Sequence, residues 1–428
     1  FLPLNTAYTA TELSYFVGDS GAALFVCGPD EMDTLVEIVA ANDCILHTLA
    51  GDGTGTLADL VAVQSTDAPV ATRGDDDLAA LLYTSGTTGR SKGAMLTQRN
   101  LLSNAQALAE GWHFTADDVL LHALPIFHSH GLFVACNVSL LAGGAMIWLA
   151  KFDVDAVIAR LPKATAMMGV PTFYTRLLDD ARFTTDLATH MRVFISGSAP
   201  LLAETHERFE ARTGHLILER YGMTETNMNT SNPYDGERRA GTVGFALPGV
   251  TVKVCDPETG EELPQGDIGV LEVRGPNVFK GYWKMPEKTR EELREDGFFI
   301  TGDLAMVDAD GYVTIVGRSK DVIISGGFNI YPREIEMFLD DLPGVMESAV
   351  VGAPHSDFGE SVVAVLVAEP EVNCDLEAIK AAVKRDLAGF KRPRHFAVLE
   401  ALPRNAMGKV QKKELRAQFA QVFLGAEG

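Results

Sequence analysis

One glycine-rich segment combines the residue types that bind phosphate groups. Residues 83–93 read Tyr-Thr-Ser-Gly-Thr-Thr-Gly-Arg-Ser-Lys-Gly, with three glycines, several hydroxyls and one lysine. Glycines allow backbone N–H groups to approach an anion closely, and the hydroxyl and ammonium groups supply further donors. The glycine spacing differs from the GxxxxGK[ST] pattern of a Walker loop. We therefore predict a polyphosphate-binding loop of another kind, with a flexible surface loop as the alternative.

Short apolar runs alternate with helical patterns through roughly the first 250 residues. The runs 78–83, 191–195 and 216–218 each enter a loop rich in small residues, and helices are expected at 98–109 and 203–212. Such alternation predicts an α/β fold with a largely parallel sheet. Ligands of such sheets gather beyond the carboxyl ends of the strands, which is where the glycine-rich segment lies.

The pattern changes twice in the second half of the chain. From 249 to 282, short strands separated by Gly and Pro predict a smaller β-rich subdomain. After Arg318, a stretch of roughly 110 residues with helices expected at 331–339 and 375–387 predicts a compact α+β domain.

Composition narrows the function classes. The chain has 428 residues, which suits two or three domains, and no apolar run is long enough to predict a transmembrane helix. Acidic residues outnumber basic residues by 22, which argues against a nucleic-acid partner and requires any anionic ligand to use a local basic pocket. The cysteines are scattered and suit a reducing compartment, so we expect a cytoplasmic protein whose cysteines are small core residues: Cys27, Cys44, Cys136, Cys255 and Cys374.

Five further segments follow the glycine-rich loop in a fixed order. They are Ser-Gly-Ser-Ala-Pro at 196–200, Tyr-Gly-Met-Thr-Glu-Thr at 221–226, Thr-Gly-Asp at 301–303, Gly-Arg-Ser-Lys-Asp at 317–321 and Pro-Arg-Asn-Ala-Met-Gly-Lys at 403–409. Together the six segments resemble the signature of the adenylate-forming superfamily, which includes acyl-CoA synthetases, luciferases and peptide-synthetase adenylation domains.

The resemblance implies a domain organisation. A large multi-layered α/β domain with a small β subdomain would span 1–317, a hinge 318–320, and a mobile α+β domain 321–428. It also implies that about 70–100 residues of the usual large domain would precede Phe1. The oligomeric state is not indicated.

The resemblance also implies a reaction in which ATP activates a carboxylate as an acyl-adenylate and CoA then accepts the acyl group. Lys409 would neutralise charge between the carboxylate and the α-phosphate, although a surface lysine beside Lys412 and Lys413 is the alternative. Glu225 would bind Mg²⁺ and Thr224 the α-phosphate. The residues assigned to ATP or AMP are Thr84, Ser85, Gly86, Thr87, Thr88, Gly89, Lys92, Gly197, Ser198, Ala199, Glu219, Tyr221, Gly222, Asp303 and Arg318. Ordinary loop and cap roles are the alternative for several of them.

The hinge would lie at Lys320, about which the small domain rotates between the two half-reactions. Gly326 and Gly327 would then face the arm of CoA, since glycines permit close backbone approach. The basic cluster at 391–394 either meets the phosphates of CoA or is a solvated surface patch.

Arg176, on the helix expected after Pro171, indicates which kind of acid is activated. A cation buried in an acid-binding pocket needs an anion, which a second carboxylate of the substrate would supply. The alternative is that Arg176 points to solvent.

Residues 226–231 and 239–244, together with 128–131, resemble malonyl-CoA synthetases. The resemblance places Ser129, Met228 and Arg239 at the acyl group. His128 would bond the acyl phosphate or gate the pocket, and a core or loop-bracing role is the alternative. A small Ser129 would leave room for a 2-methyl group. We therefore predict an ATP-dependent malonate–CoA ligase, with methylmalonate as a further substrate. The alternatives are a ligase for short or medium-chain monocarboxylates and a non-catalytic relative that acts as a binding module.

Overall fold

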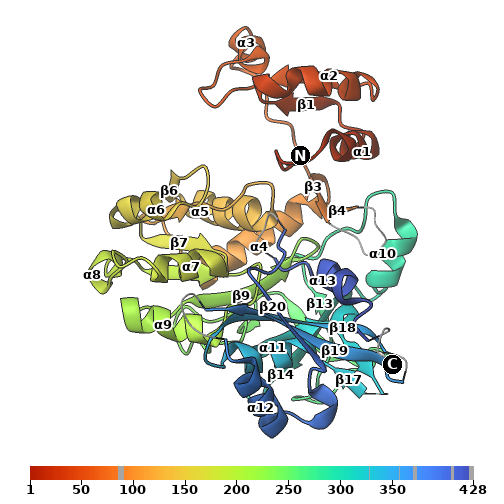
Figure 1. Cartoon of the computed structure of the whole chain (residues 1–428). Coiled ribbons are helices and arrows are strands. Elements are labelled where there is room, and N and C mark those ends of the chain that lie inside the picture. Colours follow the sequence, from red (N-terminus) through yellow and green to blue (C-terminus); the bar gives the residue numbers. More distant parts are fainter. Residues whose placement is uncertain (85–90, 327, 356, 370–373, 406–408, 424–428) are drawn as a thin grey trace.

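The computed structural model describes residues 1–84, 91–326, 328–355, 357–369, 374–405 and 409–423. Figure 1 shows a small lobe at the N-terminus, a large central body and a C-terminal unit against that body. None of the described helices is both long and apolar enough to cross a membrane. Short 3₁₀ helices occur at Pro29–Glu31, Leu161–Lys163, Ser319–Asp321 and Gly389–Lys391.

The N-terminal lobe consists of three helices and two parallel strands. They are α1 (Ala10–Ser20), β1 (Leu24–Cys27), α2 (Met32–Ala40), β2 (Ile45–Thr48) and α3 (Thr56–Ala62). The lobe is attached to the central body through α1, where the Phe16 ring packs 4.7 Å from the Tyr83 ring. The Asp19 backbone carbonyl also accepts a hydrogen bond from the Trp283 indole at 2.9 Å.

A seven-stranded sheet forms the centre of the large body, in the order β11-β10-β9-β8-β7-β5-β6. Its strands are β5 (Val119–His122), β6 (Ala145–Trp148), β7 (Ala166–Gly169), β8 (Val193–Ser196), β9 (Leu218–Met223), β10 (Asn227–Ser231) and β11 (Phe245–Ala246). The pairs from β6 to β9 are parallel, whereas β10 and β11 are antiparallel additions. The predicted α/β fold with a largely parallel sheet is confirmed.

Helices cover both faces of this sheet. One face packs against α4 (Gln98–Gly111), the π-helix His130–Cys136 and α5 (Asn137–Ala142). The other packs against α6 (Val154–Arg160), α7 (Pro171–Leu178), α8 (Thr185–Ala188) and α9 (Ala203–Thr213). Adjacent strand residues such as Met167 and Met168 enter opposite cores, as the two-residue period of a strand requires. The helices expected at 98–109 and 203–212 are therefore confirmed within two residues.

Two antiparallel sheets complete the large body. The hairpin β3 (Leu78–Thr84) and β4 (Lys92–Thr97) flanks the glycine-rich loop. A four-stranded sheet contains β12 (Thr251–Cys255), β13 (Gly269–Arg274), β14 (Phe299–Val307) and β15 (Val313–Arg318), and α10 (Pro286–Glu292) connects β13 to β14. The predicted β-rich subdomain is present and extends beyond 282 to Arg318.

The C-terminal unit has a five-stranded sheet with helices on both faces. Its strands are β16 (Ile323–Ser325), β17 (Phe328–Ile330), β18 (Val345–His355), β19 (Gly359–Ala368) and β20 (His395–Leu399). Helices α11 (Pro332–Asp340) and α12 (Leu376–Asp386) cover one face, and α13 (Lys412–Phe419) packs on the other. The small α+β unit and both of its predicted helices are confirmed. Helix α11 also contacts β15 of the large body.

Candidate active site

The ends of the β3–β4 hairpin hold the two described flanks of the glycine-rich loop. Lys92 lies 3.3 Å from Glu292 Oε2, and its ammonium group stands 4.1 Å from the centre of the Tyr282 ring. Thr84 Oγ1 lies 3.5 Å from Glu225 Oε1. The intervening candidates lie outside the described residues: Ser85, Gly86, Thr87, Thr88 and Gly89. The fold thus brings both flanks of the loop next to Glu225, and phosphate binding by the loop stays a prediction.

Glu225 is a buried carboxylate at the turn between β9 and β10, with an exposed fraction of 5%. Burial raises its pKa, the Glu292 charge adds to this effect, and the charge of Lys92 opposes it. The Tyr282 hydroxyl lies 3.0 Å from Glu225 Oε1 and 2.6 Å from Glu292 Oε2. A hydroxyl has one proton, so it donates to only one of these carboxylates at a time.

The surroundings of Glu225 are compatible with Mg²⁺, which takes one or two carboxylates together with phosphate oxygens and water. A carboxylate beside the hydroxyl of Thr84 supplies such donors. In the described part of the chain, no three His, Cys, Asp or Glu side chains form a metal-binding group. Thr224, next to Glu225, is half-buried.

Asp303 of β14 contacts two other predicted nucleotide residues, Tyr221 of β9 and Arg318 of β15. This carboxylate is 3% exposed, accepts a hydrogen bond from the Tyr221 hydroxyl at 2.6 Å, and lies 2.7 Å from Arg318 Nε. Asp303 and Arg318 are direct partners in the β14–β15 register. The Asp303 charge raises the pKa of Arg318. The residues form a compact polar group that is suited to ribose hydroxyls.

Lys409 of the C-terminal unit belongs to the same neighbourhood. Its side chain keeps an exposed surface, but the protein around it displaces part of its hydration shell. This desolvation lowers its pKa, the charge of Arg318 lowers it further, and Asp303 acts in the opposite direction. Lys320 lies in the 3₁₀ turn between the two units, where desolvation and Arg318 also lower its pKa. Lys409 is therefore near enough to the Asp303–Arg318 pair for both charges to act on it.

A buried cation, which the sequence analysis missed, lies on β9 beside the end of β8. Arg220 is 3% exposed, and its Nε and Nη2 have no hydrogen-bond partner among the described residues. A Cβ at Gly197 would lie 2.3 Å from the guanidinium carbon, so only glycine leaves room for it. Burial lowers the pKa of Arg220 to about 9. A buried cation with open donors is costly unless an anion pairs with it.

His130 and Ser198 form a further wall of this cation site. Ser198 has the left-handed φ of 72°, and its hydroxyl lies 3.0 Å from His130 Nδ1. His130 Nε2 is buried and has no described partner. Burial, with the charge of Arg220, holds the pKa of His130 well below its usual value, so the imidazole is neutral. Arg220 and His130 both bury nitrogen atoms that have no described partner, and such atoms are suited to a carboxylate.

The two arginines expected at the acid have different surroundings. Arg176 is on the exposed face of α7, because the helical period turns Tyr174, Leu177 and Leu178 into the core instead. Its side chain is thus at the surface rather than buried, and its contact with the acid stays a prediction.

Arg239 lies among acidic side chains. It pairs with three carboxylates, at 3.1 Å from Glu237, 3.2 Å from Asp308 and 2.8 Å from Asp310. Its guanidinium lies over the Tyr312 ring at 4.1 Å. These contacts balance its charge within the protein, and its contact with the acid stays a prediction.

The remaining acyl candidates lie at the start of the π-helix and on β10. Ser129 is buried just before the π-helix, and burial lowers the pKa of the neighbouring His128 to about 4. Met228 is 2% exposed, and its methyl group would lie 2.6 Å from a Cβ at Gly222. Met228 also shares a core cluster with Val134 of the π-helix. These positions suit the lining of a small pocket.

Glu219 precedes Arg220 on β9 and points to the opposite face. Its Oε1 lies 3.7 Å from His206 Nδ1 of α9 and accepts a hydrogen bond from the Gly241 backbone at 3.3 Å. Burial raises its pKa. The carboxylate is thus held inside the protein, away from Asp303. Ala199 follows Ser198 and is half-buried.

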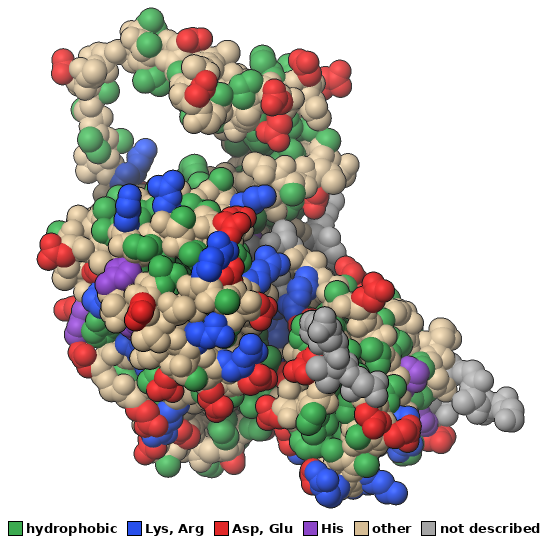
Figure 2. Space-filling view, turned by 60° about the vertical axis from the view of Figure 1, so that its left-hand side comes forward, with side chains coloured by type: hydrophobic (Ala, Val, Ile, Leu, Met, Phe, Trp, Pro, Cys, Tyr) green, Lys and Arg blue, Asp and Glu red, His purple; other side chains and the backbone are tan. Residues whose placement is uncertain are grey.

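The residues expected at CoA lie on the C-terminal unit. Gly326 has a left-handed φ of 56° and donates a backbone hydrogen bond to Phe358 at 2.9 Å, and Gly327 lies outside the described residues. In the basic cluster, Lys391 pairs with Glu334 at 2.5 Å and Arg394 lies over the Phe358 ring. Figure 2 shows Lys and Arg side chains gathered near the middle of one face of this acidic chain.

Comparisons with known proteins agree with this geometry. The family model of the AMP-binding enzyme matches residues 1–283, and that of the AMP-binding enzyme C-terminal domain matches 334–409. The chain is 37% identical over 451 residues to malonate–CoA ligase from Arabidopsis thaliana, covering 97% of this chain and 73% of that protein. It is also 37% identical to feruloyl-CoA synthase from an Amycolatopsis species, covering 98% and 84%. The crystal structure of ATP-bound MatB from Rhodopseudomonas palustris superposes with a TM-score of 0.96 at 57% identity, covering 99% and 84%.

Proposed function

The chain belongs to the family of AMP-binding enzymes, and from that premise we propose that it is an ATP-dependent ligase that joins malonate to CoA. The reaction passes through malonyl-adenylate and releases pyrophosphate and then AMP. The observation that carries the choice of acid is Arg220, a buried guanidinium with open donors whose charge acts on His130.

In the first half-reaction, a carboxylate oxygen of malonate attacks the α-phosphorus of ATP and the bond to pyrophosphate breaks. Two anions must approach, so catalysis consists mainly of positioning and charge neutralisation. We assign the ammonium group of Lys409 to this charge, Thr224 to the α-phosphate, and the Asp303–Arg318 pair to the ribose. Glu225 would hold Mg²⁺ near Thr84, and the ion would neutralise charge on the phosphate oxygens.

In the second half-reaction, the CoA thiol attacks the acyl carbon, the bond to AMP breaks, and the thiol proton is released. Lys409 is not needed for this step. We propose that the C-terminal unit rotates about Lys320 between the steps, so that Gly326 and Gly327 come to face the CoA arm. The basic cluster at 391–394 would then approach the CoA phosphates.

Malonate fits the buried cation better than a monocarboxylate does. One carboxylate of malonate reacts, and the other would pair with Arg220 and His130. A monocarboxylate would expel water from the pocket and leave the guanidinium unpaired, which costs about 1–3 kcal/mol or more for a charged group. The equal identity to the malonate and feruloyl enzymes shows that overall similarity does not select the acid, so the pocket must.

The proposal is tested by CoA-thioester formation with malonate, methylmalonate, succinate, acetate and butyrate, each with ATP, Mg²⁺ and CoA. Malonate should lead acetate and butyrate by at least about tenfold, as expected for a charged hydrogen-bonded pair. Acetate or butyrate in the lead would favour the monocarboxylate ligase. Failure with every acid to exchange pyrophosphate into ATP would favour a non-catalytic relative. A cytoplasmic location belongs to the proposal, since all five cysteines are free thiols.

A further inference from the structure

Lys409 is carried by a short hairpin rather than by a helix or a long strand. The Asn405 backbone N–H donates to the Lys409 carbonyl at 3.0 Å, and the Gln411 N–H donates to the Pro403 carbonyl at 2.7 Å. The Lys409 N–H also donates to Asn405 Oδ1 at 3.0 Å. These bonds join the legs 403–405 and 409–411 to each other. Attachments outside the hairpin must therefore decide where Lys409 stands.

Arg404 of the first leg pairs with Glu347, and a second attachment begins one residue after the hairpin. Lys412, the first residue of α13, places its ammonium group 2.6 Å from Glu336 Oε1 on α11. The same oxygen accepts a hydrogen bond from the Val350 backbone of β18 at 2.8 Å, and Glu336 is 6% exposed. One buried carboxylate thus links α11, β18 and the start of α13.

The neighbours of Glu336 increase its need for a cation. Asp340, one helical turn later, has one buried oxygen without a described partner. Burial raises the pKa of Asp340 to about 7, and the Glu336 charge contributes to that rise. Arg333 lies 3.8 Å from Asp340, whereas Lys412 pairs with Glu336. Lys412 is therefore the cation that directly balances the Glu336 carboxylate.

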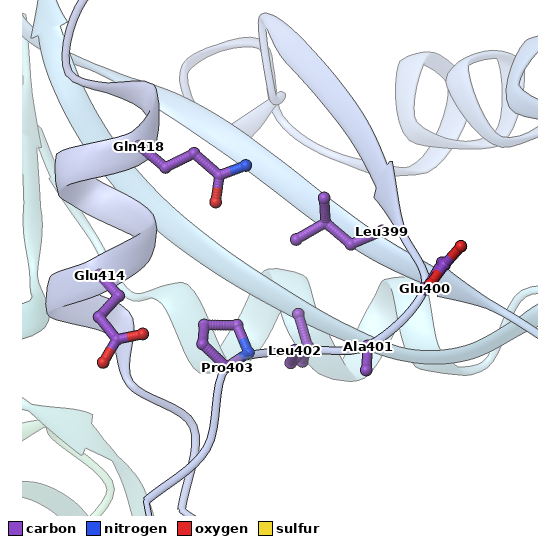
Figure 3. A pocket seen from close by; sticks show the side chains of 7 residues that line it. All are labelled: Leu399, Glu400, Ala401, Leu402, Pro403, Glu414 and Gln418. Carbon is purple, nitrogen blue, oxygen red and sulfur yellow. The ribbon is translucent and has the colours of Figure 1, made fainter.

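The opposite side of α13 is open. Figure 3 shows Glu414 and Gln418 on α13 across a groove of about 560 Å³ from Leu399 and Pro403. On its buried side the helix inserts Leu415, which is fully buried, into the core. Arg416, further along the helix, pairs with Asp321 at 2.6 Å. A directional ion pair at the first residue fixes the end from which the hairpin projects.

We propose that Glu336 is a positioning residue for Lys409, acting through its buried ion pair with Lys412. This inference rests on the proposed function, because the position of Lys409 matters only in the adenylation step. A displacement of about 1 Å in a reacting constellation can cost roughly 10²-fold in rate, so a small shift of the hairpin should be measurable. Glu336 itself touches neither substrate nor reacting atoms.

The test separates the two half-reactions. The first is followed as malonate-dependent exchange of pyrophosphate into ATP. The second is followed as thioester formation from synthetic malonyl-adenylate and CoA. Glu336→Gln removes the charge but keeps an oxygen for the Val350 N–H, and Lys412→Met removes the cation. We expect either variant to lower exchange by at least about tenfold and to leave the second half-reaction within about twofold. Lys412→Arg should restore most of the exchange.

A matched control is the exposed pair between Lys380 and Glu377 on α12, at 2.8 Å. Lys380→Met should change neither half-reaction. Because removing one partner of a buried pair can weaken folding, the double variant Glu336→Gln/Lys412→Met, which leaves no unpaired charge, is measured beside the single variants. It should show the same selective loss of exchange.

Several results would overturn the inference. Equal loss of both half-reactions would mean that Glu336 serves only the fold. Unchanged exchange in the double variant would mean that the ion pair does not place Lys409. If the unsubstituted chain performs no exchange with any acid, the proposed function fails and the inference fails with it. If it exchanges with malonate and the variants equal it, only the inference fails.

Discussion

Arg220 and Gly197 are in direct contact, and the guanidinium carbon occupies the space 2.3 Å from the position of a Cβ at 197. The loop after β8 thus lies against the guanidinium of Arg220, which belongs to β9. The contact links the segment assigned to the nucleotide with the cation assigned to the acid.

Replacing Gly197 with Ala should displace the Arg220 side chain. The added methyl group overlaps the guanidinium, and overpacking of this kind costs about 1–3 kcal/mol. We expect a higher KM for malonate and a lower midpoint of thermal unfolding. Unchanged KM and unchanged melting would contradict the contact.

Replacing Arg220 with Ala should remove the selectivity for malonate. A charged hydrogen-bonded contact contributes about 1.5–3 kcal/mol, so kcat/KM for malonate should fall by roughly 10- to 100-fold while that for acetate is retained. The measurement is thioester formation with both acids. Arg176→Ala and Arg239→Ala are the controls, since Arg176 is exposed and Arg239 is paired with carboxylates, and each should leave the preference intact. A loss of preference in Arg176→Ala alone would show that the acid binds elsewhere.

Replacing Lys409 with Met should affect only adenylation. Loss of one preorganised charge typically costs 10²- to 10³-fold, so pyrophosphate exchange should fall by about that factor. Thioester formation from synthetic malonyl-adenylate should continue. The exposed Lys413→Met is the control and should be active in both steps. Exchange that survives in Lys409→Met would identify it as an ordinary surface lysine.

The loss of pyrophosphate exchange at high pH should also follow the deprotonation of Lys409. Its cationic form is the active one, and desolvation and Arg318 lower its pKa. Exchange should therefore decline as pH rises through a value below that of a free lysine. A decline only at the pH of free lysine would contradict this environment.

Replacing Tyr282 with Phe should raise the pH at which adenylation is lost on acidification. The carboxylate form of Glu225 is needed, so exchange is lost as pH falls through its pKa, which burial already raises. The Tyr282 hydrogen bond opposes that rise, and its removal should shift this loss to higher pH. The pH profile of exchange is the measurement. Tyr312→Phe, whose hydroxyl bonds the Glu237 backbone, should leave the pH of this loss unchanged.

Replacing Ser129 with Thr should reduce the turnover of methylmalonate relative to malonate. Ser129 is 8% exposed, so an added methyl group would occupy pocket volume. One methyl group in a pocket typically changes discrimination by about 10-fold or more. The ratio of kcat/KM for the two acids is measured, and equal turnover by Ser129→Thr would contradict the assignment of Ser129 to this wall.

The sequence alone predicted the strands, helices and motifs that depend on local pattern. The helix at 98–109 was predictable because its period of apolar residues and its cap lie within a few turns. The six motifs identified the family because residue types and order are readable without coordinates. Local pattern did not show that Asp303 and Arg318 are direct partners, since that depends on the register of β14 and β15.

Tertiary structure alone decided which arginine is buried with open donors. Arg176, Arg220 and Arg239 carry the same charge, and the motif neighbourhood did not distinguish them. Strand alternation on β9 turns Arg220 inward between β8 and the π-helix, whereas the rotation of α7 turns Arg176 to solvent and three carboxylates hold Arg239. The chemistry of a side chain is encoded in its residue type. Its partners are set by packing between segments far apart in the chain, because helix rotation and strand register are fixed only when those segments bury their apolar faces together.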